Sequence, residues 1–198
     1  TLIHAGATPP SPAMFRKKQL MTQPRQRIFA ATILNGVNVS GLLETVDAIK
    51  DNPEIAQYNF RAVNTWLGGD RNRSTMKEFS GALTEHRTGV QAFIADNGAP
   101  EVLFGDDAAP SPAEWLLHAL IGCLTTTTAY HAAAQGIPIE AIDGEIDGDL
   151  DLRGFLGLSE KVRKGYSAIR VRLRVKTKAA PEAIKALAGM SPVYDVVA

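Results

Sequence analysis

The chain has 198 residues, of which 45% are hydrophobic and 21% charged, a composition that gives a soluble globular protein enough apolar side chains for a core. Its 21 basic and 21 acidic residues cancel, so no global positive field exists to attract nucleic acid or anionic lipid. The longest apolar run, residues 115–124, is too short to span a bilayer. We therefore expect no nucleic-acid partner and no membrane insertion.

The number of cysteines indicates the redox state of the compartment in which the protein is found. The single cysteine, Cys123, excludes a disulfide within these residues and is typical of a reducing compartment, so we expect a cytoplasmic location. The N-terminus lacks the apolar segment of a secretory signal. Prolines at 9, 10 and 12 and a basic cluster at 16–18 are typical of an extended, solvated segment. We expect a flexible tail over 1–25 and a folded domain over 26–198.

The first half of the domain predicts one helix followed by antiparallel strands. Apolar residues recur at helical spacing in the first segment, and alternate with polar residues in the next ones. Gly68-Gly69-Asp70 marks a turn, so the strands on either side of it are expected to pair. The expected elements are a helix over 39–50, strands over 58–66, 74–83 and 90–95, and a loop over 98–110.

The second half opens with a strong helix start. Ser111 can cap the helix, Pro112 suits its first position, and Glu114 can reach back to the amide of the cap residue. Gly136 is expected to end this helix after about residue 135. Two later segments alternate, one with acidic and the other with basic residues outside, which predicts cross-strand ion pairs. The remaining expected elements are strands over 139–150 and 166–176, a helix over 181–188 and a last helix from 191.

This order of elements favours an α+β domain with one long helix against antiparallel sheet. The long helix is apolar almost all round, since Leu116, Leu117, Leu120 and Leu124 cover more than one face. A helix of this kind needs burial on more than one side. A second subunit is a natural cover, so we expect a homodimer.

Three segments resemble the OsmC/Ohr family. They are residues 111–128 around Cys123, residues 145–158, and Ser191-Pro192-Val193-Tyr194-Asp195. The resemblance implies the OsmC-like fold, in which antiparallel sheets wrap around long central helices in an intertwined dimer with sites at the subunit interface. It also implies thiol-dependent reduction of organic hydroperoxides by two cysteines. This chain has the first, Cys123, and has Ser191 at the position of the second.

Cys123 has two interpretations. A lone cysteine in an apolar helix is usually a small, inert core residue. A reactive cysteine needs a group that stabilises the thiolate, such as a cation. His118 points to another side of the helix and His131 lies about 12 Å further along it, so neither can serve. An activating group must come from another strand or another subunit.

The family resemblance implies such a group: an arginine from the first hairpin, paired with a glutamate near the helix start. Arg73 is our preferred candidate, with Arg71 and Arg87 as alternatives. Glu114 is the candidate glutamate, although it lies one position beyond the place where the family has its glutamate. Closing the capping box explains Glu114 fully and is the favoured interpretation.

The histidines of the chain, four in all, have no metal-binding spacing, and no second cysteine exists to join them. We therefore predict no metal and no cofactor.

Three functions remain open at this stage. The first is a one-cysteine thiol peroxidase, in which Cys123 reduces an apolar organic hydroperoxide and an external thiol reductant restores it. The second is a non-catalytic dimer that binds an apolar small molecule at the subunit interface near Cys123. The third, thiol-based acyl transfer or hydrolysis, lacks a visible histidine partner for Cys123.

Overall fold

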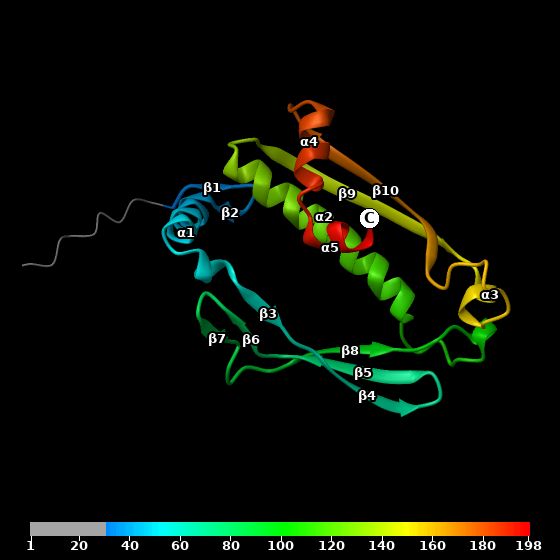
Figure 1. Ribbon diagram of the computed structural model, residues 1–198. Helices are drawn as coiled ribbons and strands as arrows, with labels where there is room; N and C mark the ends of the chain where they lie inside the picture. The colour runs from blue at the N-terminus through cyan, green and yellow to red at the C-terminus, as the bar shows by residue number, and fades with distance from the viewer. Residues whose placement is uncertain (1–30) are drawn as a thin grey trace, which may run out of the picture. The chain divides into compact units, whose positions relative to one another are not determined.

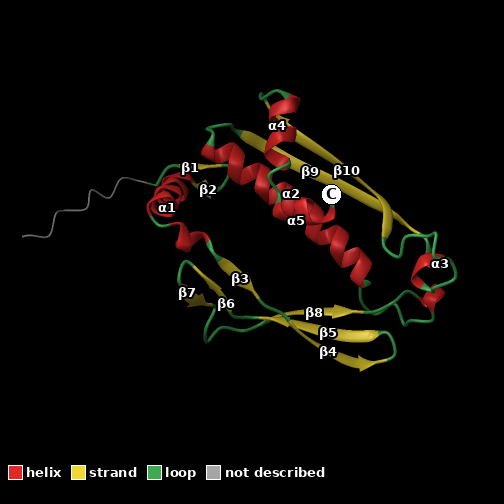
Figure 2. Cartoon of the chain, in the orientation of Figure 1, coloured by secondary structure: helices red, strands yellow, loops and turns green. Residues whose placement is uncertain are grey.

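Helices and antiparallel strands alternate along residues 31–198, the part of the chain that the computed structural model describes (Figures 1 and 2). These residues form a single unit, and every strand pair within it is antiparallel. The predicted α+β class is thereby confirmed. The predicted tail over 1–25 and the domain start at residue 26 lie outside the described residues and stay predictions.

Five α-helices and two short 3-10 helices occur among the described residues. The α-helices are α1 (Val39–Asp51), α2 (Pro112–Ala134), α3 (Leu152–Phe155), α4 (Pro181–Ala188) and α5 (Pro192–Val197), and the 3-10 helices are η2 (Pro53–Ala56) and η3 (Glu101–Leu103). The strands are β1 (Ile33–Leu34), β2 (Val37–Asn38), β3 (Tyr58–Phe60), β4 (Val63–Gly68), β5 (Arg71–Met76), β6 (Phe79–Gly81), β7 (Thr84–His86), β8 (Phe93–Asn97), β9 (Ile139–Leu150) and β10 (Tyr166–Thr177).

The ends of α2 are those that the sequence predicts. The Ser111 hydroxyl accepts a hydrogen bond from the Glu114 backbone N–H at 3.3 Å, and the Glu114 carboxylate accepts one from the Ser111 backbone N–H at 2.8 Å. This capping box satisfies two amides that the helix leaves without partners. Gly136, with φ +70°, ends the helix in the left-handed conformation that glycine tolerates best.

β9 and β10 form a two-stranded antiparallel ribbon that packs along α2 (Figure 1). Acidic side chains of β9 face basic side chains of β10, as predicted. Arg172 donates to Glu145 at 2.9 Å, and Arg170 pairs with both Asp147 and Asp149. All these groups are exposed, so the pairs fix the register of the ribbon more than they stabilise the fold.

The core lies where α2 meets α4. On α2 every fourth residue is buried, namely Leu120, Leu124, Thr128 and Ala132, which places all four on one face of the helix. Ala132 packs with Ile184 and Leu187 of α4, and Ile139 of β9 and Val175 of β10 pack against this cluster. The α2 helix therefore carries one well-buried stripe, with Cys123 immediately beside it in sequence.

The predicted pairing of residues 58–66 with 74–83 across the turn at 68–70 is confirmed, but the two strands are not continuous. The expected strand over 58–66 is divided between two sheets, because β3 pairs with β6 whereas β4 pairs with β5. The expected strand over 74–83 is divided in the same way into β5 and β6. The chain thus passes from one sheet to the other and back, and alternation alone cannot reveal such a crossing because it continues through the break.

Two smaller differences follow further along. The strand expected over 90–95 is β8, which begins at Phe93 and pairs with β5. Strand β7 was not predicted, because its three residues are too few to give an alternating pattern.

Candidate thiol site

Cys123 lies in the middle of α2 and is partly exposed. Its sulfur is 3.9 Å from the hydroxyl oxygen of Thr127, one helical turn further on. The next residue, Leu124, belongs to the buried stripe and is only 5% exposed. The thiol is therefore held at the edge of the core and is open on one side, unlike the fully buried thiol of an inert core residue.

The start of α5 supplies further contacts to this thiol. Ser191 caps α5 by accepting a hydrogen bond from the Tyr194 N–H at 3.2 Å, and it is 1% exposed. Its hydroxyl group and the backbone N–H of Val193 lie near the Cys123 thiol and both act to lower its pKa. The structure thus brings together Cys123 and Ser191, the two positions that the sequence analysis connected, although 68 residues separate them in the chain.

These contacts affect the acidity of the thiol. Burial is the largest single influence and raises the pKa of Cys123, because it disfavours the charged thiolate. Hydrogen bonds from Ser191, from the Val193 N–H and from Thr127 favour the thiolate and together outweigh burial. The pKa of Cys123 therefore lies below its ordinary value. No charged residue of the described part of the chain contributes to this shift.

Arg73 has a different partner within one chain. Its guanidinium donates to both carboxylate oxygens of Asp96, from Nε at 2.6 Å and from Nη2 at 2.8 Å. The backbone oxygen of Asp96 in turn accepts a hydrogen bond from the indole N–H of Trp115, in the first turn of α2. Hydrogen bonding to Arg73 also holds the pKa of Asp96 below its usual range. Arg73 is thus part of an ion pair on β5 and β8.

The two alternative arginines are also engaged elsewhere. Arg71 forms an ion pair with Asp106 at 2.8 Å. The Arg87 guanidinium stacks over the rings of Phe79 and Phe93, at 4.7 and 5.3 Å from their centroids. None of the three candidate arginines contributes a cation to Cys123 within one chain.

Glu114 occupies the role that the capping box assigns to it. Its carboxylate accepts hydrogen bonds from the Ser111 N–H and hydroxyl, both at 2.8 Å, and these bonds lower the pKa of Glu114. Glu114 precedes Cys123 by nine helical residues, a separation of about 13.5 Å along the axis. Within one chain, Glu114 therefore pairs with neither Arg73 nor the thiol.

Comparison with known proteins finds one family model that matches part of the chain. A family model described as OsmC-like protein matches residues 105–198, the part of the chain that contains α2, the β9–β10 ribbon, Cys123 and Ser191. Residues 105–198 are therefore OsmC-like in sequence. No curated protein matches the chain.

Solved structures share the OsmC-like fold. One is a protein from Psychrobacter arcticus whose name refers to osmotic stress and a detoxification response, with 16% identity, a TM-score of 0.50, and coverage of 69% of this chain and 87% of the other. Another is an OsmC-like protein of unknown function from Vibrio cholerae, with 14% identity, a TM-score of 0.51, and coverage of 70% and 92%. At these identities the likeness concerns the fold alone.

Two contacts of the Cys123 thiol were not found from the sequence. Thr127 follows Cys123 at the i+4 spacing that places side chains on one face of a helix, so this contact could have been found. The Val193 N–H could not, because the docking of α5 on α2 depends on tertiary packing that no local pattern encodes.

The described residues contain neither a metal-binding cluster nor a helix that could span a membrane. Among residues 31–198, His, Cys, Asp and Glu side chains nowhere gather in a group of three that could hold a metal ion. In the same part of the chain, each helix is either too short or too polar to cross a membrane.

Proposed function

We propose that this OsmC-like protein is a one-cysteine thiol peroxidase that reduces apolar organic hydroperoxides. The observation that carries the proposal is the placement of the partly exposed Cys123 thiol against the start of α5, where Ser191 and the Val193 N–H favour its thiolate. The thiolate is the nucleophilic form of cysteine. A single cysteine also fits a reducing compartment such as the cytoplasm, in which external thiols are abundant.

The reaction proceeds in two stages. The Cys123 thiolate attacks the distal oxygen of the hydroperoxide, an S–O bond forms, the O–O bond breaks, and the departing alkoxide takes up a proton to give an alcohol. Cys123 becomes a sulfenic acid. An external thiol then displaces water to form a mixed disulfide, and a second thiol releases reduced Cys123. Ser191 cannot form a disulfide, so the external thiol is obligatory.

A homodimer is part of the proposal. The described residues contain seven buried hydrophobic side chains but 26 exposed large ones. Those on β3, β4 and β8 include Phe60 and Val63, each 69% exposed, and Ile94, 55% exposed. Apolar surface of this extent is typical of an interface. A second copy of the chain covers it and also covers the exposed side of α2.

We further propose that the missing cation comes from the partner copy. Arg73 exposes about half of its side chain, so it remains accessible to a second molecule despite its pairing with Asp96. Its guanidinium keeps its charge at every physiological pH. A cation beside the thiolate favours ionisation and also stabilises the charge that develops on the departing alkoxide.

One observation favours the alternative function, a non-catalytic dimer that binds an apolar small molecule. Within one chain no cation reaches Cys123, and hydrogen bonds alone shift its acidity. If the partner supplies no cation either, the apolar surface around the thiol serves binding rather than chemistry.

Consumption of cumene hydroperoxide with excess dithiothreitol separates the two functions. The wild type should consume peroxide catalytically, and Cys123→Ser should not exceed the rate without protein. Arg73→Met should lower the rate about tenfold, equivalent to about one pKa unit of lost charge stabilisation. Asp96→Asn tests whether this loss comes from the cation or from the ion pair, and Arg71→Met is the comparison variant. Equal consumption by the wild type and Cys123→Ser would refute the peroxidase proposal.

A further inference from the structure

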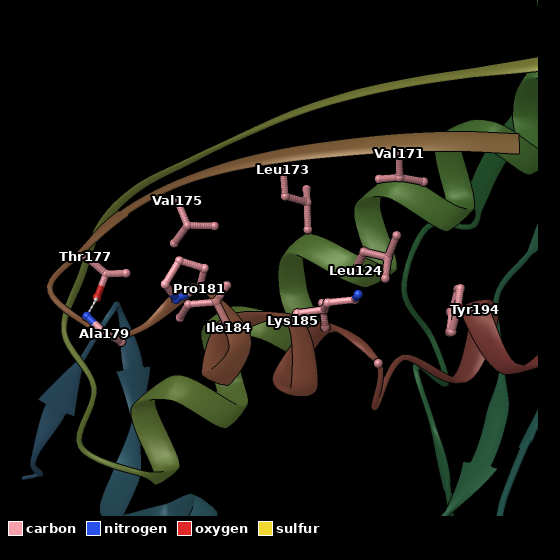
Figure 3. Close-up of a pocket in the computed structure, with 12 residues that line it drawn as sticks. Leu124, Val171, Leu173, Val175, Thr177, Ala179, Pro181, Ile184, Lys185 and Tyr194 are labelled. Carbon is pink, nitrogen blue, oxygen red and sulfur yellow. Dashed lines mark hydrogen bonds between the residues drawn. The ribbon is translucent and has the colours of Figure 1, made fainter.

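A cavity of about 730 Å³ lies between β10 and α4, beyond the thiol site (Figure 3). Alternate side chains of β10, including Val171, Leu173 and Val175, form one wall, and α4 forms the opposite wall. Small residues of α4, such as Ala188, keep the space open. Its volume falls within the range of about 300–1,000 Å³ that small-molecule sites occupy.

The polar groups of this cavity are few. Lys185 of α4 is its one charged lining residue, and Figure 3 shows the Lys185 side chain extending from the helix in the direction of Leu124. Among residues 31–198, no carboxylate forms an ion pair with Lys185. The hydroxyl of Thr177 is already used, since it donates to the Pro138 carbonyl oxygen at 2.7 Å. The cavity thus combines aliphatic walls with one ammonium group, that of Lys185, which is exposed to solvent and in no ion pair among residues 31–198.

We propose that this cavity binds an aliphatic carboxylate, a fatty acid or a similar single-chain acid. The chain lies between β10 and α4, and the carboxylate contacts the Lys185 ammonium group. Burial of an apolar chain against aliphatic walls supplies the affinity. The charge of Lys185 favours an anionic head group over a neutral alcohol and repels a cation, and this preference is modest because Lys185 is exposed.

The site is separate from the proposed chemistry. Leu124 and Tyr194 bound one end of the cavity, and each lies next to the thiol site in sequence, but neither Cys123 nor Ser191 lines it. Binding therefore needs no reactive thiol, and a ligand can be tested on a chain that has lost its cysteine. The proposal stands or falls independently of the peroxidase activity.

Titration calorimetry with decanoate on the full-length Cys123→Ser chain tests the proposal. Decanoate should bind, with octanoate about 15-fold weaker, since each methylene contributes about fourfold. Decanol should bind more weakly than decanoate, and decylamine weakest of the three. Lys185→Gln should weaken decanoate by up to about fivefold without changing decanol. Lys178→Gln, which removes a neighbouring charge outside the cavity, should change neither.

Substitutions that fill the cavity provide a second test of the proposal. Ala188→Trp should abolish decanoate binding while circular dichroism shows the helix content unchanged. If the tryptophan side chain disturbs folding, the smaller substitution Ala188→Leu replaces it and should weaken decanoate binding. The proposal is wrong if decanoate does not bind, if filling the cavity leaves its affinity unchanged, or if Lys185→Gln weakens decanol equally. If decanoate does not bind and Ala188→Trp also dissociates a dimer, the occupant of the cavity is a second copy of the chain instead of a fatty acid.

Discussion

Two regions of the described chain bury apolar surface to very different extents. The helix region, residues 112–198, contains a continuous core built from α2, α4 and the β9–β10 ribbon. The hairpin region, residues 58–97, buries no large apolar side chain, although it carries Phe60, Trp66 and Phe93. The helix region therefore has a core of its own, whereas the apolar residues of the hairpin region are suited to a surface that another molecule supplies.

The same division separates the two halves of the proposed chemistry. The helix region holds Cys123 and the hydrogen-bonding groups that lower its pKa. The hairpin region holds the candidate arginines, each with another partner inside the chain. Under our proposal, the site becomes complete only when the hairpin region of one copy meets the helix region of another.

The first prediction tests this division through assembly. Phe60→Ser combined with Ile94→Ser removes two exposed apolar side chains of the hairpin region, each worth about 1.5–3 kcal/mol when buried. The dimer should weaken a hundredfold or more, as measured by sedimentation equilibrium. Phe155→Ser is the matched control in the helix region, because Phe155 is exposed to the same 69% as Phe60. A wild-type chain that is monomeric at micromolar concentration would contradict the proposed dimer.

The second prediction tests the junction of α2 and α5. Ser191→Cys places a second thiol beside Cys123, and peroxide should then convert the pair to an internal disulfide, because a sulfenic acid condenses with a neighbouring thiol. The substitution removes the cap of α5 and should cost about 1 kcal/mol of unfolding free energy. Mass spectrometry should detect the loss of two hydrogens and a peptide cross-link between the two positions.

Ser40→Cys in α1 is the control for this variant and should form no internal cross-link. Disulfide geometry is strict, since Cα atoms more than about 7 Å apart cannot be bridged without movement of the backbone. If Cys123 instead overoxidises to sulfinic acid while the new thiol remains open to alkylation, the two positions are not neighbours in solution.

The third prediction concerns Glu114, whose role we assign to the capping box. Glu114→Gln keeps a hydrogen-bonding side chain but removes a charge near the helix N-terminus, and should cost about 0.5 kcal/mol for this exposed group. Because folding lowers the pKa of Glu114, this contribution is fully present above the unfolded value of about 4.3 and is lost as pH falls through the lower folded value. Urea denaturation from pH 6 down to pH 3 should show the two proteins converging. A large loss of peroxidase activity in Glu114→Gln would assign it a catalytic role instead.

Local signals in the sequence predict the helix region well. The capping box of Ser111 and Glu114, the stop at Gly136 and the acidic and basic faces of β9 and β10 are all confirmed. Each depends on residues that are close in sequence or on one strand pair. The resemblance to the OsmC family also led to the pairing of positions 123 and 191, which no local pattern contains.

The hairpin region is predicted less well for a physical reason. The sequence predicts that residues 58–66 pair with 74–83, but not that this hairpin is divided between two sheets, because the alternating pattern runs through both breaks. The partners of Arg73 and Arg71 depend on long-range contacts, since Asp96 and Asp106 lie 23 and 35 residues further along the chain. The spacing of residues in the sequence cannot predict the partner of a side chain when tertiary packing determines that partner.

The acidity of Cys123 tests the central claim most directly. The rate of alkylation by iodoacetamide, measured against pH, gives the pKa of the thiol in the folded protein. We predict a midpoint below the free-thiol value of about 8.5, and a higher midpoint in Ser191→Ala, which removes one hydrogen bond to the thiolate. A wild-type midpoint at or above about 8.5 that Ser191→Ala leaves unchanged would contradict the account and would make Cys123 an ordinary buried cysteine.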